Sequence, residues 1–278
     1  MLTIVKRALE AEQRSSLIEL IVILSMTSVL FYLLETNMLV FGLFVYAGLI
    51  WVVRDAPNYK LGMVTGAVGG IVGFATEYWG CARHYWNWVI PCKSIWMVNG
   101  MEDGFPVEVV IAYAGAGFWM TKLSLKMFAK EHAESAEFFR QKRYLTSFSP
   151  RFALALITAL VGVTVICIEP AFLQSTLIFM FGVSVSAFLP RSALGVVLPF
   201  SAVVGVVGFF FENFATGFFS SFAVWRYNLS AYADVRIPNP IIGVAPITAF
   251  IAYVGVGLLL FGLSFLLNHA LTEETRSQ

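Results

Sequence analysis

Two glutamates stand at the ends of nearly identical apolar segments, and their side chains are the first candidates for chemistry. The segment 70–77 reads GIVGFATE and the segment 205–212 reads GVVGFFFE. An acid inside an apolar run costs about 2.5–3.5 kcal/mol at mid-membrane on insertion scales, so acids in such positions are functional by default. The carboxyl group either finds a polar partner or keeps its proton. A carboxylic acid that keeps its proton in an apolar site can act as a proton donor.

Glycines spaced three or four residues apart precede each acid. At that spacing they share one face of a helix and let membrane helices approach closely. The acids continue this face, so we expect both carboxyl groups to point into a helical bundle. The alternative is a buried, hydrogen-bonded carboxyl group that only fixes helix packing. The residues concerned are Gly62, Gly66, Gly70, Gly73 and Glu77, and then Gly205, Gly208 and Glu212.

Aromatic residues follow each acid at matched places, as WNW at 86–88 and as WRY at 225–227. Aromatic side chains at a membrane border usually form a belt. The alternative is a lid that closes an apolar cavity over the acids. In that case the side chains expected to line the cavity or to pair with the acids are Trp86, Trp88, Trp225, Tyr227, Tyr113, Tyr253, Arg83 and Arg226.

A third acid, Glu108, stands at the start of a helix expected over 105–127. Negative charge at a helix N-terminus complements the helix dipole, which is a structural reason for an acid there. Glu108 could also reach the cavity from this first turn, although its counterpart Thr248 cannot ionise. No His-Glu-x-x-His, phosphate loop or Gly-x-Ser-x-Gly motif occurs, so we expect neither a metal, a cofactor nor a serine nucleophile.

The composition indicates which solvent must surround these groups. Of the 278 residues, 59% are hydrophobic and only 13% are charged, whereas soluble domains keep about a quarter charged. Membrane lipid is therefore the expected solvent. The net charge of +1, without a basic cluster of interleaved aromatics, gives no reason to expect nucleic acid as a partner.

The sequence predicts an all-α, polytopic integral membrane protein. A spanning helix needs about 20 mostly apolar residues. Lys and Arg are concentrated in connections that share one side if the helices number eight, which places both termini in the cytoplasm. The expected spans are about 16–35, 38–54, 61–80, 105–127, 152–169, 171–190, 192–213 and 241–267.

Similar blocks recur in the same order along the chain and predict an internal duplication. Besides the two octapeptides, PVEVVIAYAGAG from Pro106 matches PITAFIAYVGVG from Pro246, and Glu35 matches Glu169. The expected organisation is a first four-helix repeat over 1–128, a polar cytoplasmic linker over 129–150 and a second four-helix repeat over 151–278. Four helices per repeat make the two repeats parallel in the membrane.

An acid near a helix end, then Trp-x-aromatic, then a proline that opens another helix, resembles membrane-embedded carotenoid-biosynthesis proteins. These are the bisanhydrobacterioruberin-hydratase-type proteins and the tandem-domain lycopene cyclases. The matching positions are Glu77, Trp86, Trp88, Pro106 and Glu108 in the first half, and Glu212, Trp225, Tyr227, Gly243 and Pro246 in the second. The resemblance implies a long, apolar, isoprenoid substrate.

Three functions are compatible with these patterns. The first is proton-initiated hydration or cyclisation of an isoprenoid alkene, with Glu77 and Glu212 as proton donor and partner base and with aromatic faces that stabilise the cation. The second is a proton-coupled transporter or lipid translocator, because internal repeats and intramembrane acids occur in carriers. The third is a non-catalytic scaffold subunit of a membrane complex. The sequence leaves the oligomeric state open.

Overall fold

The computed structural model describes residues 59–88, 96–98, 104–141, 150–168, 172–216, 225–228 and 241–276. The spans expected at 16–35 and 38–54 and the pair Glu35 and Glu169 lie outside these residues. Most of the described residues are helical, as the sequence predicts. The helices are α4 (Tyr59–Ala82), α5 (Glu108–Met127), α6 (Ala129–Arg140), α7 (Pro150–Ile168), α8 (Leu173–Ala187), α9 (Arg191–Ala215) and α10 (Ile247–Arg276).

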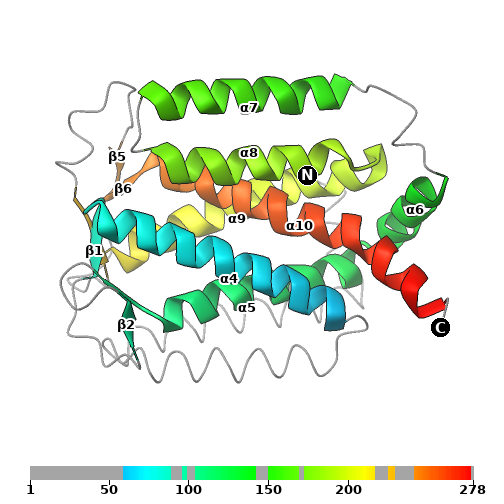
Figure 1. The fold of residues 1–278 in the computed structure, drawn as a ribbon, viewed down its shortest axis with the longest axis horizontal. Coiled ribbons are helices and arrows are strands. Elements are labelled where there is room, and N and C mark those ends of the chain that lie inside the picture. The colour runs from blue at the N-terminus through cyan, green and yellow to red at the C-terminus, as the bar shows by residue number, and fades with distance from the viewer. Residues whose placement is uncertain are drawn as a thin grey trace.

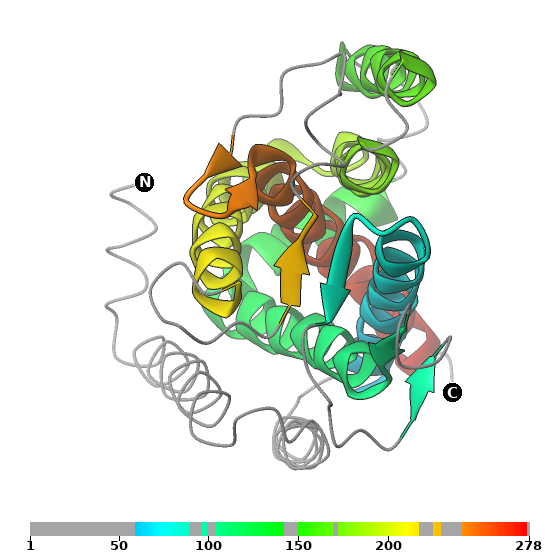
Figure 2. The same cartoon turned by 90° about the vertical axis from the view of Figure 1, so that its left-hand side faces the viewer.

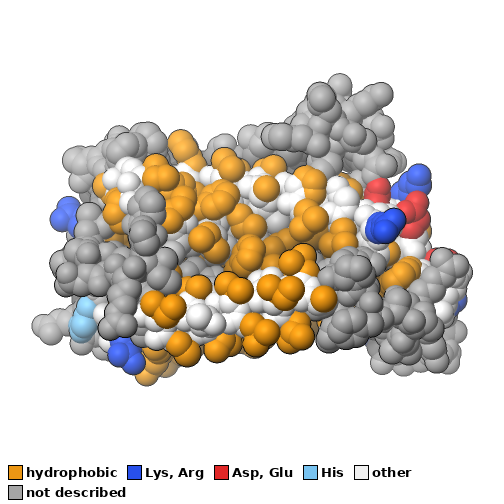
Figure 3. Space-filling model, turned by 90° about the horizontal axis from the view of Figure 1, so that it is seen from above, with side chains coloured by type: hydrophobic (Ala, Val, Ile, Leu, Met, Phe, Trp, Pro, Cys, Tyr) orange, Lys and Arg blue, Asp and Glu red, His pale blue; other side chains and the backbone are white. Residues whose placement is uncertain are grey.

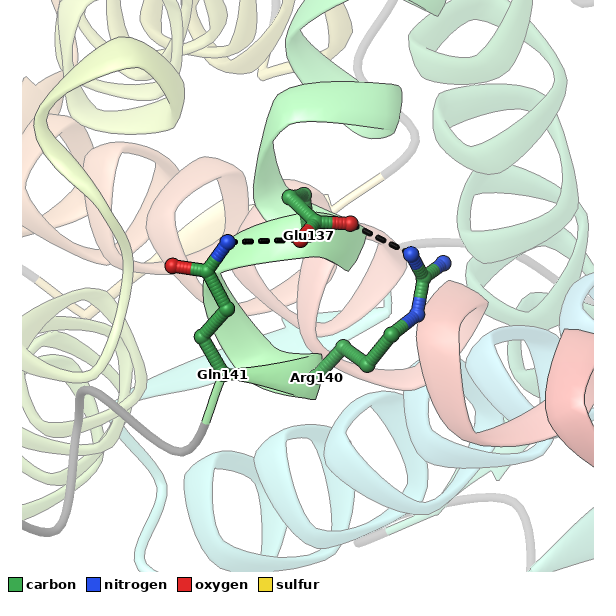
Figure 4. Close-up of polar contacts among 3 residues, drawn as sticks. All are labelled: Glu137, Arg140 and Gln141. Atoms are coloured by element: carbon green, nitrogen blue, oxygen red, sulfur yellow. Dashed lines mark hydrogen bonds and ion pairs between the residues drawn. The ribbon is translucent and has the colours of Figure 1, made fainter.

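Helices occur at each expected span that falls within the described residues, and α6 is a further helix in the part expected to be linker. Within the described residues, two helices are long and apolar enough to cross a membrane, over Arg191–Asn213 and Ile247–Asn268. All the long helices run along the long axis of the molecule, whereas α6 lies at one end of it (Figure 1). The surface of α6 is polar, and Glu137 there accepts hydrogen bonds from Arg140 and Gln141 (Figure 4).

Close helix contacts form where glycines stand. Helix α4 packs along α5, and α10 packs along both α9 and α8. A Cβ atom at Gly117 would lie 2.3 Å from the carbonyl oxygen of Thr65, and one at Gly255 would lie 2.7 Å from the backbone nitrogen of Phe179. At the α4–α5 contact, the hydroxyl groups of Thr65 and Thr121 are 2.6 Å apart. These contacts need residues without a Cβ, and the first of them lies against the expected glycine stripe, because a Cβ at Gly117 would also be 2.9 Å from Cα of Gly66.

Six short strands among the described residues modify the all-helical expectation. They pair antiparallel as β1 with β4, β2 with β3 and β5 with β6. Residues 105–106 and 241–246, which we expected to be helical, belong to strands and a turn, because proline has no N–H to donate inside a helix. The turn between β5 and β6 places Gly243 at φ 70°, which glycine adopts without strain. The strands are β1 (Trp86–Trp88), β2 (Met97–Val98), β3 (Phe105–Pro106), β4 (Trp225–Tyr227), β5 (Ile241–Ile242) and β6 (Ala245–Pro246).

Large apolar side chains cover the outer faces of the long helices. Charged side chains on the face seen in Figure 3 lie near its two ends, with apolar side chains between them. Helix α7 contributes Leu154, Leu156, Ile157, Leu160 and Val161, each more than half exposed. The interior instead holds a cluster between α5, α6, α9 and α10 that includes Leu123, Met127, Phe128, Phe139, Val197, Phe261 and Phe265.

Candidate functional site

Glu77 lies near the end of α4 and is only 6% exposed. Its Oε2 atom accepts two indole hydrogen bonds, from Nε1 of Trp86 at 3.0 Å and from Nε1 of Trp88 at 3.2 Å. Both donors come from β1, which follows α4 directly along the chain. The chain therefore turns back over the end of α4, and β1 supplies two neutral indole donors to the buried carboxyl group.

Glu212 occupies the corresponding place near the end of α9 and is 8% exposed. Its Oε2 atom accepts hydrogen bonds from Nε1 of Trp225 at 3.2 Å and from the hydroxyl of Tyr227 at 2.9 Å. A third donor, the hydroxyl of Tyr253 on α10, lies 2.8 Å from Oε1. The second acid is thus held by three neutral donors from two elements.

Strands β1 and β4 join the two acids into one site, and we call this pair the aromatic ribbon. Figure 2 shows the two strands side by side across the end of the helices. Trp86 pairs with Tyr227 and Trp88 pairs with Trp225, with ring centroids 6.0 Å and 5.1 Å apart. Directly paired residues of an antiparallel ladder point to the same side. All four aromatic side chains therefore share the face from which the acids are bonded.

Tyr113 and Tyr253 are positioned in the same way. A Cβ atom at Gly73 would lie 2.3 Å from Cγ of Tyr113, and one at Gly208 would lie 2.2 Å from Cγ of Tyr253. Each tyrosine ring therefore fills the space above a glycine that stands four residues before an acid. The Tyr253 hydroxyl donates to Glu212, and the Tyr113 hydroxyl lies near Glu77.

The groups that bond the two acids are neutral. Within the described residues, neither acid forms an ion pair with a lysine or arginine. The two carboxyl groups are close enough to interact with each other electrostatically. Arg83 and Arg226 are not brought to the acids: the Arg83 guanidinium lies 4.8 Å from the centroid of the Trp79 ring, and Arg226 is exposed on the opposite face of the ribbon. Strand alternation explains the second case.

Glu108 is wholly buried in the first turn of α5, but it is not among the hydrogen-bond donors or charged partners of Glu77 and Glu212. Sequence reasoning missed Asn213, whose Oδ1 accepts a hydrogen bond at 3.0 Å from the backbone N–H of Val244. This contact ties the turn between β5 and β6 to α9 next to the second acid. The available signal was an amide residue that directly follows the second acid in the sequence.

A second buried polar cluster lies at the end of the molecule that carries α6, and sequence reasoning missed it as well. The His132 ring stacks on Phe265, with centroids 3.8 Å apart, and its Nε2 lies 2.9 Å from Oγ of Ser124. Ser264 Oγ lies 2.8 Å from Ser124 Oγ. Burial lowers the pKa of His132 from 6.5 to about 3. The imidazole ring is therefore neutral and joins α6 to both α5 and α10.

Among known proteins, no family model, no curated protein and no solved structure matches this chain. Within the described residues, no group of three or more His, Cys, Asp or Glu side chains could hold a metal ion. The site is thus characterised by its geometry alone: two buried carboxyl groups, a neutral aromatic shell and an apolar outer surface. Such an arrangement can store, donate and take back a proton.

Proposed function

We propose that this chain is a multi-pass membrane enzyme that transfers a proton from a buried glutamate to an alkene of a long, apolar isoprenoid. The observation that carries the proposal is the pair of acids beneath the aromatic ribbon. Both are buried, both are bonded by neutral indole and phenol groups, and they are close enough to sense each other's charge.

The membrane architecture that we infer is a duplicated four-helix unit, with about eight spans and both termini in the cytoplasm. The duplication is supported by equivalent contacts in the two halves. Gly208 lies 135 positions after Gly73, and Tyr253 lies 140 positions after Tyr113. The close contact of Gly73 with Tyr113 in the first half recurs as that of Gly208 with Tyr253 in the second. The same shifts relate the contact of Gly66 with Gly117 to that of Ser201 with Gly257. The apolar faces of α7 and α9 suit contact with lipid.

The proposed chemistry balances without a cofactor. The carboxyl O–H proton passes to one alkene carbon, and the π electron pair forms the new C–H bond, which leaves a tertiary carbocation and a carboxylate. Water then adds through oxygen and returns a proton to the carboxylate, or an internal alkene adds and a neighbouring C–H bond loses its proton. The first outcome is hydration and the second is cyclisation. The site requires one of the two carboxyl groups to be protonated before the reaction.

The neutral shell suits each stage of this reaction. Indole and phenol donors stabilise the carboxylate that remains after proton transfer, because a charged acceptor strengthens a hydrogen bond. The same donors do not lock the acid into its ionised form as a lysine or arginine would. The faces of Trp86, Trp88, Trp225 and Tyr227 are suited to stabilise a nearby cation.

The first experiment is organic extraction and mass spectrometry of the untreated, purified protein, in which we expect an isoprenoid. The decisive assay supplies protein in lipid vesicles with lycopene in heavy water. The wild type should give a hydrated or cyclised product that carries deuterium at the protonated carbon. Glu77→Gln and Glu212→Gln should each abolish this product, whereas Glu137→Gln on the exposed surface of α6 should retain it.

Full turnover in both glutamine variants would refute the role of the acids. A wild-type protein that moves the polyene between vesicles without changing it chemically would instead support the carrier, and one that does neither would support a scaffold. Each variant should be compared with the wild type for its thermal unfolding midpoint, so that loss of product is separated from loss of fold.

A further inference from the structure

Two buried polar groups close to Glu77 have no hydrogen-bond partner among the residues that the structure describes. They are the hydroxyl of Thr76, a side chain that is 5% exposed, and the indole Nε1 of Trp79. Buried polar groups are nearly always bonded, and leaving one unpaired costs about 1–3 kcal/mol. Two such groups within one helical turn mark a place where a polar partner from outside the described residues would be stabilised.

Thr76 departs from the pattern of the other buried helical hydroxyls. Those of Thr65, Thr121, Ser201 and Thr216 each donate to the backbone carbonyl four residues earlier. A helix offers this acceptor to every threonine. The Thr76 hydroxyl does not use it, so this group is oriented toward something other than its own helix.

The second half of the chain shows that the fold does not require polar groups at these positions. The shift of 135 positions that relates Glu77 to Glu212 places Phe211 at the position of Thr76 and Phe214 at that of Trp79. Both equivalents lack hydrogen-bonding side chains. The polar groups at positions 76 and 79 therefore distinguish the first half of the chain from the second.

Thr76 and Trp79 stand three positions apart on α4; Thr76 is buried and Trp79 is half-buried, with its indole nitrogen shielded from solvent. Residues three apart are neighbours on a helix surface. The exposed face of α4 is occupied by Ile71, Phe74 and Tyr78, whereas Thr76 is buried. The guanidinium of Arg83 covers one face of the Trp79 ring at 4.8 Å and so holds the indole in place.

We propose that Thr76 and Trp79 form a hydroxyl-binding subsite beside the acid pair. The indole can only donate, and the threonine hydroxyl can both donate and accept. A partner that serves both groups would be an oxygen that accepts from the indole and exchanges a hydrogen bond with the threonine, which describes water or an alcohol. In the proposed reaction this subsite holds the water that captures the cation, or the hydroxyl of the hydrated product. The assignment of that role rests on the proposed function, but the binding itself does not.

The test uses the full-length protein in lipid nanodiscs with ¹⁵N-labelled tryptophan. The spectrum of the Trp79→Phe variant identifies the indole resonance of Trp79. The probes are phytol, an isoprenoid alcohol, and phytane, its saturated counterpart without a hydroxyl. We expect phytol but not phytane to shift the Trp79 resonance, and the near-isosteric Thr76→Val to remove the response. Thr76→Ser, which keeps the hydroxyl, should preserve it. The indole resonances of Trp88 and Trp225 report whether each variant remains folded.

A second pattern also supports the subsite. If neither probe acts, but the Trp79 indole proton exchanges magnetisation with water and Thr76→Val shifts its resonance, the bound oxygen is that of water. The inference is overturned if phytane acts as strongly as phytol. It is also overturned if the Trp79 resonance is unchanged by both probes, shows no exchange of magnetisation with water and is not shifted by Thr76→Val. Because the readout is binding, a response of Trp79 in a protein whose acids prove catalytically silent would leave the subsite standing and the proposed reaction refuted.

Discussion

Protonation of His132 offers a quantitative test of how α6 is fixed to the bundle. Burial lowers its pKa from 6.5 to about 3, so the folded protein keeps a neutral ring in a range where the unfolded chain takes up a proton. The stability that the folded protein gains from keeping His132 neutral is fully present above about pH 6.5 and is lost as the pH falls toward about 3. In that range the folding equilibrium constant decreases roughly tenfold per pH unit. Between about pH 7.5 and about pH 5 this amounts to about 2 kcal/mol.

The perturbation is His132→Phe, which preserves an aromatic ring against Phe265 and removes the titration. At neutral pH, loss of the hydrogen bond to Ser124 should cost the variant about 1 kcal/mol. As the pH is lowered, the wild type should lose about 2 kcal/mol more than the variant, or about 4–8 °C in the unfolding midpoint. The assay is thermal unfolding at a series of pH values, monitored by tryptophan fluorescence.

The matched control is His84→Asn, because His84 is exposed and adopts φ 56°, a conformation that asparagine tolerates. This variant keeps His132 and should therefore still lose stability as the pH falls below about 6.5. Parallel profiles for the wild type and His132→Phe would refute the reasoning, since they would mean that the ring is as readily protonated in the folded protein as in the unfolded chain.

Two further predictions concern the packing and bonding of the second acid. Gly208→Ala should destabilise the protein by about 1–3 kcal/mol, because the new Cβ would lie 2.2 Å from Cγ of Tyr253. The control Gly195→Ala, where no atom lies within 4 Å of the new Cβ, should be neutral or stabilise the protein by up to about 1 kcal/mol. Equal unfolding midpoints for the two variants would contradict this packing. Tyr253→Phe removes the hydroxyl that donates to Oε1 of Glu212, so it should lower the free energy of unfolding by about 1–3 kcal/mol and reduce product formation in the lycopene assay. Wild-type values in both measurements would show that this hydrogen bond is unimportant.

Sequence reasoning was strongest where a signal is periodic along one helix. The glycine spacing before Glu77 and Glu212 predicts that the acids point toward protein, and both are buried. Tyr253 was among the several side chains expected to pair with the acids, and its hydroxyl donates to Oε1 of Glu212. The positions of the apolar helices followed from the same kind of local pattern.

Reasoning failed where a contact depends on pairing between distant segments. Three residues such as 86–88 are too short to show a strand period, and their partner strand lies in the other half of the chain. Without that pairing, Arg226 cannot be assigned to the face away from Glu212. Likewise, the polarity of α6 concealed that His132 is buried against Phe265, since burial of one residue in a polar helix depends on what docks against it.

The sequence by itself determined the apolar character of the chain, the helical positions and the presence of two matched acids, because each of these depends on composition or on spacing within one segment. The tertiary structure decided which groups bond those acids, that one antiparallel ribbon joins them, and that Thr76 and Trp79 are left unpartnered among the described residues. The reason is physical: a helix fixes the direction of its own side chains, whereas a hydrogen bond between distant residues forms only when packing brings donor and acceptor within about 3 Å.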